Sequence, residues 1–386
     1  MVTGTTESIR RANLATILQI LYRTGPCSRA TLSRATGRNR STIASLVADL
    51  VDLRLVSERE PDALGVVGRP SPVVAVRPDV AAIAVNPEID VLTIGLVGLD
   101  GTVKRTIRHE YDRIPTASEA ISITAAVVEG MRLELDGHLM AGIGVAVPGQ
   151  VRTADGVVRN APHLNWHEEP FCDPLAKATG LPVWAANDAS LGALAEHDFG
   201  AGRGKSHLIY LNGGASGIGG GLIAGGRLLG GASGYGGELG HIRVSDVPAT
   251  DSAGIAGTLE ALVNRAQLLE ALGVGRLDPD AFEARLLADT SARVRGVVEQ
   301  QLDHLAMALA AAINLLNPQV IALGGFLAAL FAYDPDRLLS AVEQATLPAS
   351  FETVTITPAE LGSNLLMIGA AQLAFAPLLE DPARMH

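Results

Sequence analysis

The sequence is poor in cysteine and has no long hydrophobic segment. Cys27 and Cys172 are its two thiols and lie far apart, which excludes a disulfide framework and a cysteine-rich metal cluster. The longest apolar run, residues 305–316, has the length of a buried helix and not of a membrane span. The N-terminus is polar and lacks a signal-peptide core with a cleavage site, so we expect a cytoplasmic protein with no membrane partner.

Aromatic residues are also scarce, at 4% of the chain, whereas hydrophobic residues make up 48%. A composition dominated by Ala, Val, Leu and Gly is expected of an α/β protein. A chain of 386 residues is longer than one compact core usually spans. We therefore expect a small N-terminal head and a larger body made of two lobes.

Lysine is absent from the first 78 residues. This segment has eleven arginines and six acidic residues, so its formal charge is +5, whereas the rest of the chain carries −16. A basic head on an acidic body fits a head that docks on nucleic acid while the body is kept away from it. A solvated basic face with no partner would show the same balance of charge.

Residues 28–50 have the spacing of a helix-turn-helix. Ser28 is placed to cap a short helix that ends at Gly37, and Asn39 is placed to cap a second helix. The second helix has apolar residues at i, i+3, i+4 and i+7, namely Ile43, Leu46, Val47 and Leu50. The helix before them repeats this spacing at Leu14, Ile17, Leu18 and Leu21. These patterns predict a three-helix unit.

Burial of these apolar stripes leaves five polar residues free at the front of the second helix. They are Arg38, Asn39, Arg40, Ser41 and Thr42. Side chains of these types contact phosphates and base edges when a recognition helix lies in the major groove. We therefore predict that they contact double-stranded DNA. The alternative is a small helical bundle with a polar end.

Two short strands are predicted after this unit, at 55–58 and 73–76, with a Gly- and Pro-containing loop between them. This is the pattern of a winged helix-turn-helix, in which the loop is the wing. Arg69 lies in that loop between Gly68 and Pro70, and its slender, positive side chain suits a narrow minor groove. An ordinary turn with an exposed arginine fits the same residues.

The body begins near residue 81 and alternates strands with helices. Strands are predicted at 81–85, 92–97, 141–147, 182–185, 207–211 and 320–323, and helices at 117–135, 191–196 and 297–316. Several of the strands run into Gly or Asp residues. Strands that end in this way place ligand-binding groups at the carboxyl edge of a sheet, where small molecules bind.

Six short motifs follow one another in the body, and their order is more specific than any one of them. They are Val147-Pro148-Gly149; Pro182-Val183 with Asn187-Asp188-Ala189; Gly217-Ile218-Gly219-Gly220-Gly221 with Gly226-Arg227; Gly236-Gly237-Glu238-Leu239-Gly240-His241; Gly257-Thr258-Leu259-Glu260; and Gly324-Gly325. With these motifs the chain resembles the ROK family of repressors, open reading frames and sugar kinases. The head resembles the family's repressor branch through Ser28 and Arg29 in SRATLSRATG and through Gly68-Arg69-Pro70.

The resemblance implies an α/β fold of the actin-like, two-lobed sugar-kinase type, with a ligand cleft between the lobes. A winged helix-turn-helix domain of the α+β class precedes it. We expect the DNA-binding domain at residues 1–78 and the effector-binding and oligomerisation domain at 79–386. The resemblance also adds Ser28 and Arg29 to the residues expected to face DNA.

The chain departs from the family's kinases at the turn that holds the phosphates of ATP. Kinase members have Asp-x-Gly-Gly-Thr where this chain has residues 86–90, Asn-Pro-Glu-Ile-Asp. Both glycines are gone, Pro87 has no N–H to donate, and Glu88 and Asp90 would repel polyphosphate. We therefore predict no kinase activity and no nucleotide cofactor. The Gly-rich run at 213–221 is interpreted as strand and turn packing.

A second departure concerns zinc. Many family members bind it with the histidine of a Gly-His pair and three cysteines in a Cys-x-Cys-Gly-x-x-Gly-Cys run. Here His241 remains, but the cysteine positions are Asp251, Ala253 and Thr258. One histidine and one carboxylate do not make a closed tetrahedral zinc site, so we predict no metal. Other contacts must then hold the loop, and we expect His241 to be freer to bond a ligand.

The carbohydrate side of the cleft looks intact. The resemblance implies that sugar hydroxyls are bound by Asn187, Asp188, Glu238, His241 and Glu260. Asparagine donates and accepts, carboxylates accept from hydroxyls, and histidine does either. In kinases the residue matching Asp188 is the base that takes the hydroxyl proton, and without ATP it would remain an acceptor. Alternatively, Asn187 and Asp188 only cap a helix, and Glu238 and Glu260 are salt-bridge partners.

These observations together predict a sugar-responsive transcriptional regulator, a repressor, that binds operator DNA as a homodimer or homotetramer. One alternative is a ROK sugar kinase with an accessory DNA-binding head. The other is a DNA-binding regulator whose ROK body is an unliganded scaffold. The identity of the sugar, the operator sequence and the sign of regulation stay open at this point.

Overall fold

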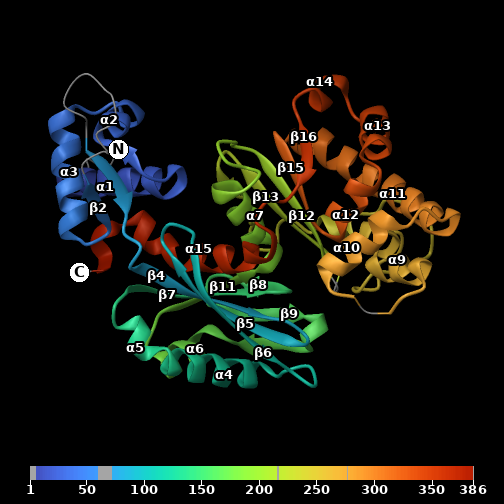
Figure 1. The fold of residues 1–386 in the computed structure, drawn as a ribbon, viewed down its shortest axis with the longest axis horizontal. Helices are drawn as coiled ribbons and strands as arrows, with labels where there is room; N and C mark the ends of the chain where they lie inside the picture. The colour runs from blue at the N-terminus through green and yellow to red at the C-terminus, as the bar shows by residue number, and fades with distance from the viewer. Residues whose placement is uncertain (1–5, 60–71, 215–216, 276, 386) are drawn as a thin grey trace. The chain divides into compact units, whose positions relative to one another are not determined.

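The computed structural model describes residues 6–59, 72–214, 217–275 and 277–385 (Figure 1). Its contacts divide the chain into two units. Unit 1 comprises Met1–Ala146, Pro170–Ala185 and Ala370–His386, and unit 2 comprises Val147–Glu169 and Ala186–Gly369. The N-terminal head therefore belongs to the same unit as the first lobe of the body.

The head consists of three helices and a three-stranded sheet of order β1-β3-β2. Its elements are α1 (Thr6–Thr24), β1 (Cys27–Ser28), α2 (Arg29–Thr36), α3 (Arg40–Asp52), β2 (Val56–Arg59) and β3 (Val73–Val76). The side chain of Ser28 caps α2, and Asn39 caps α3 by accepting from the amide of Thr42 at 2.8 Å. The predicted helices and strands are confirmed. The loop that contains Arg69 lies outside the described residues.

The rest of unit 1 is built on a five-stranded sheet of order β11-β7-β4-β5-β6. Its strands are β4 (Val80–Pro87), β5 (Val91–Gly98), β6 (Val103–Glu110), β7 (Leu139–Val147) and β11 (Val183–Asn187). The helices are α4 (Ala117–Gly130), α5 (Arg132–Leu135), α6 (Cys172–Thr179) and the end of α15 (Leu365–Glu380), followed by η4 (Pro382–Met385). Every residue of β4 is buried, as the apolar sequence of this central strand predicts.

Unit 2 contains a second five-stranded sheet, of order β14-β13-β12-β15-β16, and a small sheet of order β10-β9-β8. The large sheet has β12 (Leu208–Gly214), β13 (Gly217–Ala224), β14 (Arg227–Leu228), β15 (Val320–Gly325) and β16 (Thr355–Pro358). The small sheet has β8 (Gln150–Arg152), β9 (Val157–Ala161) and β10 (Trp166–Pro170).

Helices supply the remainder of unit 2. They are α7 (Asp188–Phe199), α8 (Leu259–Leu262), α9 (Arg265–Leu272), α10 (Pro279–Ala288), α11 (Ala292–Leu316), α12 (Phe326–Tyr333), α13 (Pro335–Ala345) and α14 (Pro348–Phe351), with short turns η1 (Pro162–Leu164), η2 (Leu239–His241) and η3 (Gly362–Asn364). The core of this unit is centred on α11, whose buried face includes Leu302, Leu305 and Leu309.

The two large sheets repeat one topology. When the strands of each sheet are numbered in chain order, both sheets read 3-2-1-4-5 from one edge to the other. In both sheets the first three strands pair antiparallel, and the fourth lies parallel to the first. This repetition confirms the expected two-lobed, actin-like α/β fold.

One helix corrects the expectation that no segment has the length and apolar character of a membrane span. Residues 362–380, which include α15, meet both criteria. However, 56% of that segment is buried inside the protein, and the core helix of a globular protein passes the same test. Figure 1 shows the end of the chain, after α15, beside the head, and Tyr22 of α1 stacks edge-on against Phe375 of α15 at 6.4 Å.

Candidate functional site

The N-terminal end of α3 presents two arginines that pair with no acid among the described residues. Arg38 and Arg40 are exposed, and in the described part of the chain their guanidinium groups have no hydrogen-bond or ion-pair partner. Asn39 and Ser41 are also exposed, and Ser41 donates to the Asn39 side chain at 2.8 Å. The positive end of the helix dipole lies at the same place, so this end of α3 attracts anions.

Four other arginines of the head are paired with acids. Arg10 pairs with Asp49, Arg11 with Glu7 and Asp381, Arg29 with Glu58, and Arg77 with Asp79. The Arg29–Glu58 pair ties α2 to β2, a structural role that the sequence did not reveal. Ser28 likewise bonds the amide of Thr31 as the cap of α2. Both residues were expected to face DNA, and each has a partner inside the head.

The turn that would hold ATP phosphates is a closed hairpin. β4 continues through Pro87, which pairs with Leu92, and the amide of Glu88 donates to the Val91 carbonyl at 2.9 Å. The side chain of Glu88 is exposed at the tip of this turn. A phosphate cradle needs several free amides in one concave turn. Here one amide is missing and the next is bonded within the hairpin, so neither is free to bond a phosphate.

β13 brings the candidate carbohydrate residues of unit 2 together through its glycines. A Cβ atom added to Gly221 would lie 2.5 Å from the Cβ of Ala193 in α7, and one on Gly220 would lie 2.6 Å from the carbonyl oxygen of Gly237. The backbone of β13 thus contacts both α7 and the segment before η2. This close approach supports the interpretation of the Gly-rich run as strand packing.

Asn187 and Asp188 lie at the junction of β11 and α7. Asn187 caps α7 by accepting from the Ser190 amide at 2.9 Å, and its side-chain nitrogen donates to the Gly149 carbonyl at 3.1 Å. Asp188 accepts from the amide of Ala189 at 2.7 Å. The capping role considered for Asn187 is therefore present. A carboxylate at the start of a helix is also favoured by the helix dipole.

Glu260 is bonded to its own chain on both oxygens. One accepts from the Ile218 amide at 2.9 Å, and the other accepts from the amide and hydroxyl of Ser252. A carboxylate with three such bonds holds β13 and the loop before α8 in place. Glu238 differs, because its side chain is 40% exposed and its carboxylate lies 3.9 Å from Nε2 of His241. The carboxylate of Glu238 is thus accessible to a ligand, whereas both oxygens of Glu260 are already bonded within the chain.

His241 is not free, contrary to the expectation from sequence. Its Nδ1 atom bonds the Asp251 carboxylate at 2.8 Å, and Asp251 has no exposed side-chain surface. Partial burial alone would lower the pKa of His241. The hydrogen bond to Asp251 and the charges of Glu260, Asp251 and Glu238 outweigh it and raise that pKa above 6.5. The imidazole is held in one orientation, with Nε2 toward Glu238.

The residues at the expected metal position do not fit zinc. His241 and Asp251 bond each other directly, Ala253 supplies no ligand side chain, and Thr258 donates its hydroxyl proton to Asp251 at 2.9 Å. Among the described residues no group of three or more His, Cys, Asp or Glu side chains is arranged to hold a metal. Sequence reasoning identified the loss of the cysteines but missed Asp251 as the partner of His241.

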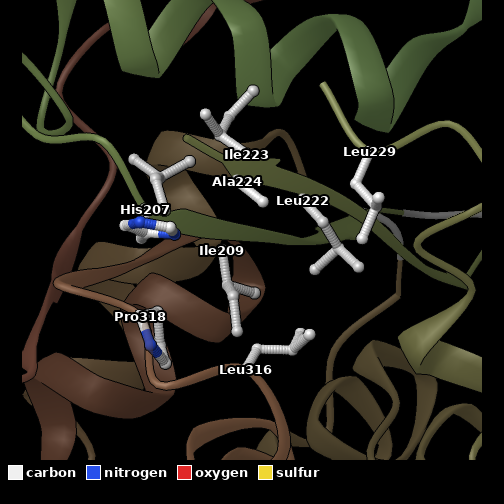
Figure 2. A pocket seen from close by; sticks show the side chains of 9 residues that line it. His207, Ile209, Leu222, Ile223, Ala224, Leu229, Leu316 and Pro318 are labelled. Carbon is white, nitrogen blue, oxygen red and sulfur yellow. The ribbon is translucent and has the colours of Figure 1, made fainter. Parts of the chain in front are cut away.

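A small pocket lies elsewhere in unit 2. Figure 2 shows that mainly apolar side chains from β12, β13 and the end of α11 line it, among them Ile209, Leu222 and Leu316, with His207 at one side. Its volume is about 30 Å³, room for one or two water molecules and not for a monosaccharide. None of the candidate carbohydrate residues lines this pocket. It is therefore separate from the candidate site.

Comparisons with known proteins find relatives of the whole chain and relatives of its body. The sequence profile of the ROK family matches residues 82–376. The xylose repressor of Bacillus spizizenii is 25% identical and covers 96% of this chain and 97% of its own length. The glucokinase of Thermotoga maritima is 29% identical over 73% of this chain and 93% of its own.

A solved structure gives the same result for the fold. It is a ROK family transcriptional regulator described as a homologue of the Escherichia coli MLC protein, with a TM-score of 0.80 and 24% identity. The match covers 96% of this chain and 97% of that one. The arrangement of head and body thus has a full-length structural counterpart.

Replacement of Gly240 by alanine should destabilise unit 2. The added Cβ would overlap the Ile218 carbonyl oxygen in β13, so we expect a loss of at least about 1–3 kcal/mol in the free energy of unfolding. Urea titration measures this change. Gly296→Ala is the control, because an added methyl group meets no atom at this exposed position of α11 and should stabilise the helix by about 0.5–1 kcal/mol. Equal stabilities of the two variants would contradict the packing described.

The bond between His241 and Asp251 should make stability depend on pH. The raised pKa of His241 contributes stability that is complete below about 6.5 and lost as the pH rises through the folded value. Burial alone would raise the pKa of Asp251, but its hydrogen bonds outweigh burial and lower that pKa. Asp251 therefore contributes stability that is present above pH 3.8 and is lost as the pH falls through its folded pKa. The difference in unfolding free energy between wild type and Asp251→Asn should therefore be largest at mildly acidic pH. A difference that stays constant from pH 5 to 9 would refute this coupling.

Proposed function

This chain belongs to the ROK family, and from that premise we propose that it is a cytoplasmic, sugar-responsive transcriptional regulator, a repressor that binds operator DNA through its head. The observation that carries the proposal is the extent of the full-length matches. Xylose repressors align with head and body together, whereas the glucokinase relative aligns with the body alone. A head joined to a ROK body is the architecture of the repressors.

The charge of the head supports DNA as its partner. Arg38 and Arg40 have no acidic partner in the part of the chain that the structure describes, and they lie at the positive end of α3 next to the exposed polar groups of Asn39 and Ser41. Unpaired guanidinium groups at the start of a recognition helix are suited to phosphates and guanine edges. In a dimer, two such helices would lie in major grooves on one side of the duplex, so the half-sites would be spaced by one helical turn or a multiple of it.

The effector site in this proposal lies around β13. Asp188, Glu238 and His241 supply two carboxylates and an imidazole, and the side chain of Glu238 is 40% exposed. Acceptors of this kind, with a donor among them, match the vicinal hydroxyls of a sugar. The names of the relatives make D-xylose and D-glucose the first compounds to test.

The kinase alternative is disfavoured by the closed hairpin at residues 86–90. With the amide of position 87 missing and that of Glu88 bonded to Val91, ATP would be held poorly, and Asp188 would act only as a hydrogen-bond acceptor. A coupled assay for ADP production from ATP with each sugar separates the two functions. Turnover on the order of 1–100 per second would establish a kinase and overturn the proposal.

The head is attached to the end of α15, and this contact is suited to couple the two sites. Arg11 of α1 bonds Asp381 at 3.1 Å, and the Gln19 side chain donates to the Leu379 carbonyl at 2.9 Å. α15 begins in unit 2, where Leu365 lies near Gly192 of α7. A change at the start of α7 can therefore reach α1 through one helix. The double variant described below measures whether this path couples the effector site to the head.

Arg38→Ala and Arg40→Ala should each weaken operator binding. The loss of one arginine that contacts a base costs about 1–3 kcal/mol, which corresponds to a fall in affinity of about 5- to 150-fold. The measurement is a fluorescence titration with a duplex that the wild type selects from a random pool. The salt dependence of binding should also become less steep.

Arg10→Ala is the matched control for these two variants. It removes the same charge from the same domain, but Arg10 is already paired with Asp49. Its operator affinity should stay close to that of wild type. If Arg10→Ala weakens binding as much as Arg40→Ala does, the head binds by its overall charge and α3 is not the reading helix.

The double variant Arg11→Ala with Gln19→Ala should uncouple the two sites. It removes the side-chain bonds from α1 to Asp381 and Leu379 and leaves α3 and β13 unchanged. We expect sugar affinity to be retained while the effect of sugar on operator affinity falls toward none. Operator titrations with and without the sugar, for wild type and variant, measure this effect. An unchanged effect of sugar would show that coupling takes another route.

A further inference from the structure

The loop between η2 and α8 is held by one buried carboxylate. Asp251 accepts four hydrogen bonds: from Nδ1 of His241 at 2.8 Å, from the Thr258 hydroxyl at 2.9 Å, and from the amides of Ala253 and Ile255, each at 2.9 Å. Its side chain has no exposed surface. Four donors converge on this carboxylate from four different residues, which is the number of ligands that a structural zinc ion would have.

Two glycines let the loop fold back around Asp251. Gly254 and Gly257 have φ of +80° and +73°, a conformation that side chains rarely adopt. A Cβ on Gly257 would overlap the Ser245 carbonyl oxygen, so the loop is also tightly packed on its own first half. The carboxylate of Asp251 therefore lies at the centre of a closely packed loop.

Asp251 also links two of the candidate carbohydrate residues. It bonds His241 directly. Thr258, which donates to Asp251, also caps α8 by accepting from the Ala261 amide at 3.3 Å, and α8 carries Glu260. Glu260 in turn bonds Ser252, the neighbour of Asp251. The carboxylate therefore fixes the orientation of His241 and the position of the helix that carries Glu260.

We propose that Asp251 replaces the metal of this family as the organising centre of the loop and positions His241 so that its Nε2 atom serves the ligand site. The loop is then independent of metal, and Asp251 is a positioning residue that acts through His241. The part of the proposal that concerns a ligand rests on the proposed function, whereas the part that concerns the loop does not.

The test begins with the full-length protein and no sugar. Wild type prepared with zinc in excess and then dialysed should contain less than one-tenth of a zinc ion per chain, and its melting temperature should be unchanged by EDTA. Asp251→Ala should speed amide hydrogen exchange by about tenfold or more in residues 250–262 and leave exchange in α3 unchanged. A stoichiometric zinc ion in the wild type, or unchanged exchange in the variant, would overturn the proposal.

The orientation of His241 has a readout of its own. In protein with isotope-labelled histidine, NMR reports which ring nitrogen of His241 carries the proton and its pKa. Asp251→Asn should lower that pKa relative to wild type and Asp251→Glu should restore part of it. The pKa values of the other histidines should be the same in all three proteins. If His241 titrates identically in all three proteins, it is not positioned by Asp251.

A gain of metal is the strictest form of the test. In the triple variant Asp251→Cys, Ala253→Cys and Thr258→Cys, three thiolates join His241, and one zinc ion per chain should bind. Zinc should then restore the slow exchange that Asp251→Ala loses. Failure to bind zinc, or binding without protection of the loop, would contradict the idea that carboxylate and metal are interchangeable centres.

Sugar binding is measured last, with D-xylose and D-glucose as probes. If wild type binds either one, Asp251→Ala should bind it about tenfold or more weakly, as expected when a hydrogen bond to a charged group is lost. If wild type and Asp251→Ala bind the sugar with equal affinity, Asp251 does not position His241 for the ligand. If wild type binds neither compound while the zinc and exchange results hold, the proposed effector class is wrong and the role of Asp251 in the loop stands.

Discussion

Close backbone packing at β13 is the constraint on which the rest of unit 2 depends. Its glycines let α7 lie against one part of the strand and the carbonyl of Gly237 against another, at distances that no side chain would permit. Asp188 begins the helix on one side, and Glu238 follows the segment on the other. The glycine-rich run of β13 therefore serves the packing of unit 2.

Local signals in the sequence predicted much of this structure. The caps of α2 and α3 follow from Ser28 and Asn39, because capping depends on residues within one turn. The strands of both sheets follow from their apolar runs and from the glycines and aspartates that end them. The ordered motifs of the body identified the family, and with it the two-lobed fold, which the repeated strand order of the two sheets confirms.

What could not be predicted depends on partners that meet only in the folded chain. Arg29 was placed on the DNA side, yet it pairs with Glu58, 29 residues away. Glu260 bonds the amide of Ile218, 42 residues away, and His241 bonds Asp251. No periodicity or spacing encodes such pairs. Residues 362–380 could not be assigned from sequence for the same reason. Their apolar composition fits a membrane span as well as a core helix, and only the neighbours in the folded chain show that the segment is partly buried.

The head and the body of the chain carry opposite net charges. Four arginines of the head are paired with acids, whereas Arg38 and Arg40 at the start of α3 have no acidic partner among the described residues, and the body carries the negative charge of the whole. Arg11 and Gln19 join the head to the end of α15.

The central claim is that one protein binds a carbohydrate and a duplex and that each ligand changes the affinity of the other. The most direct measurement is a pair of calorimetric titrations, of sugar into the free protein and of sugar into the protein saturated with its selected duplex. Linkage requires that the ratio of these two sugar affinities equal the ratio of duplex affinities with and without sugar. We expect the ratio of sugar affinities and the ratio of duplex affinities to be equal and to differ clearly from one. Sugar affinities that are identical in the presence and absence of the duplex would contradict it.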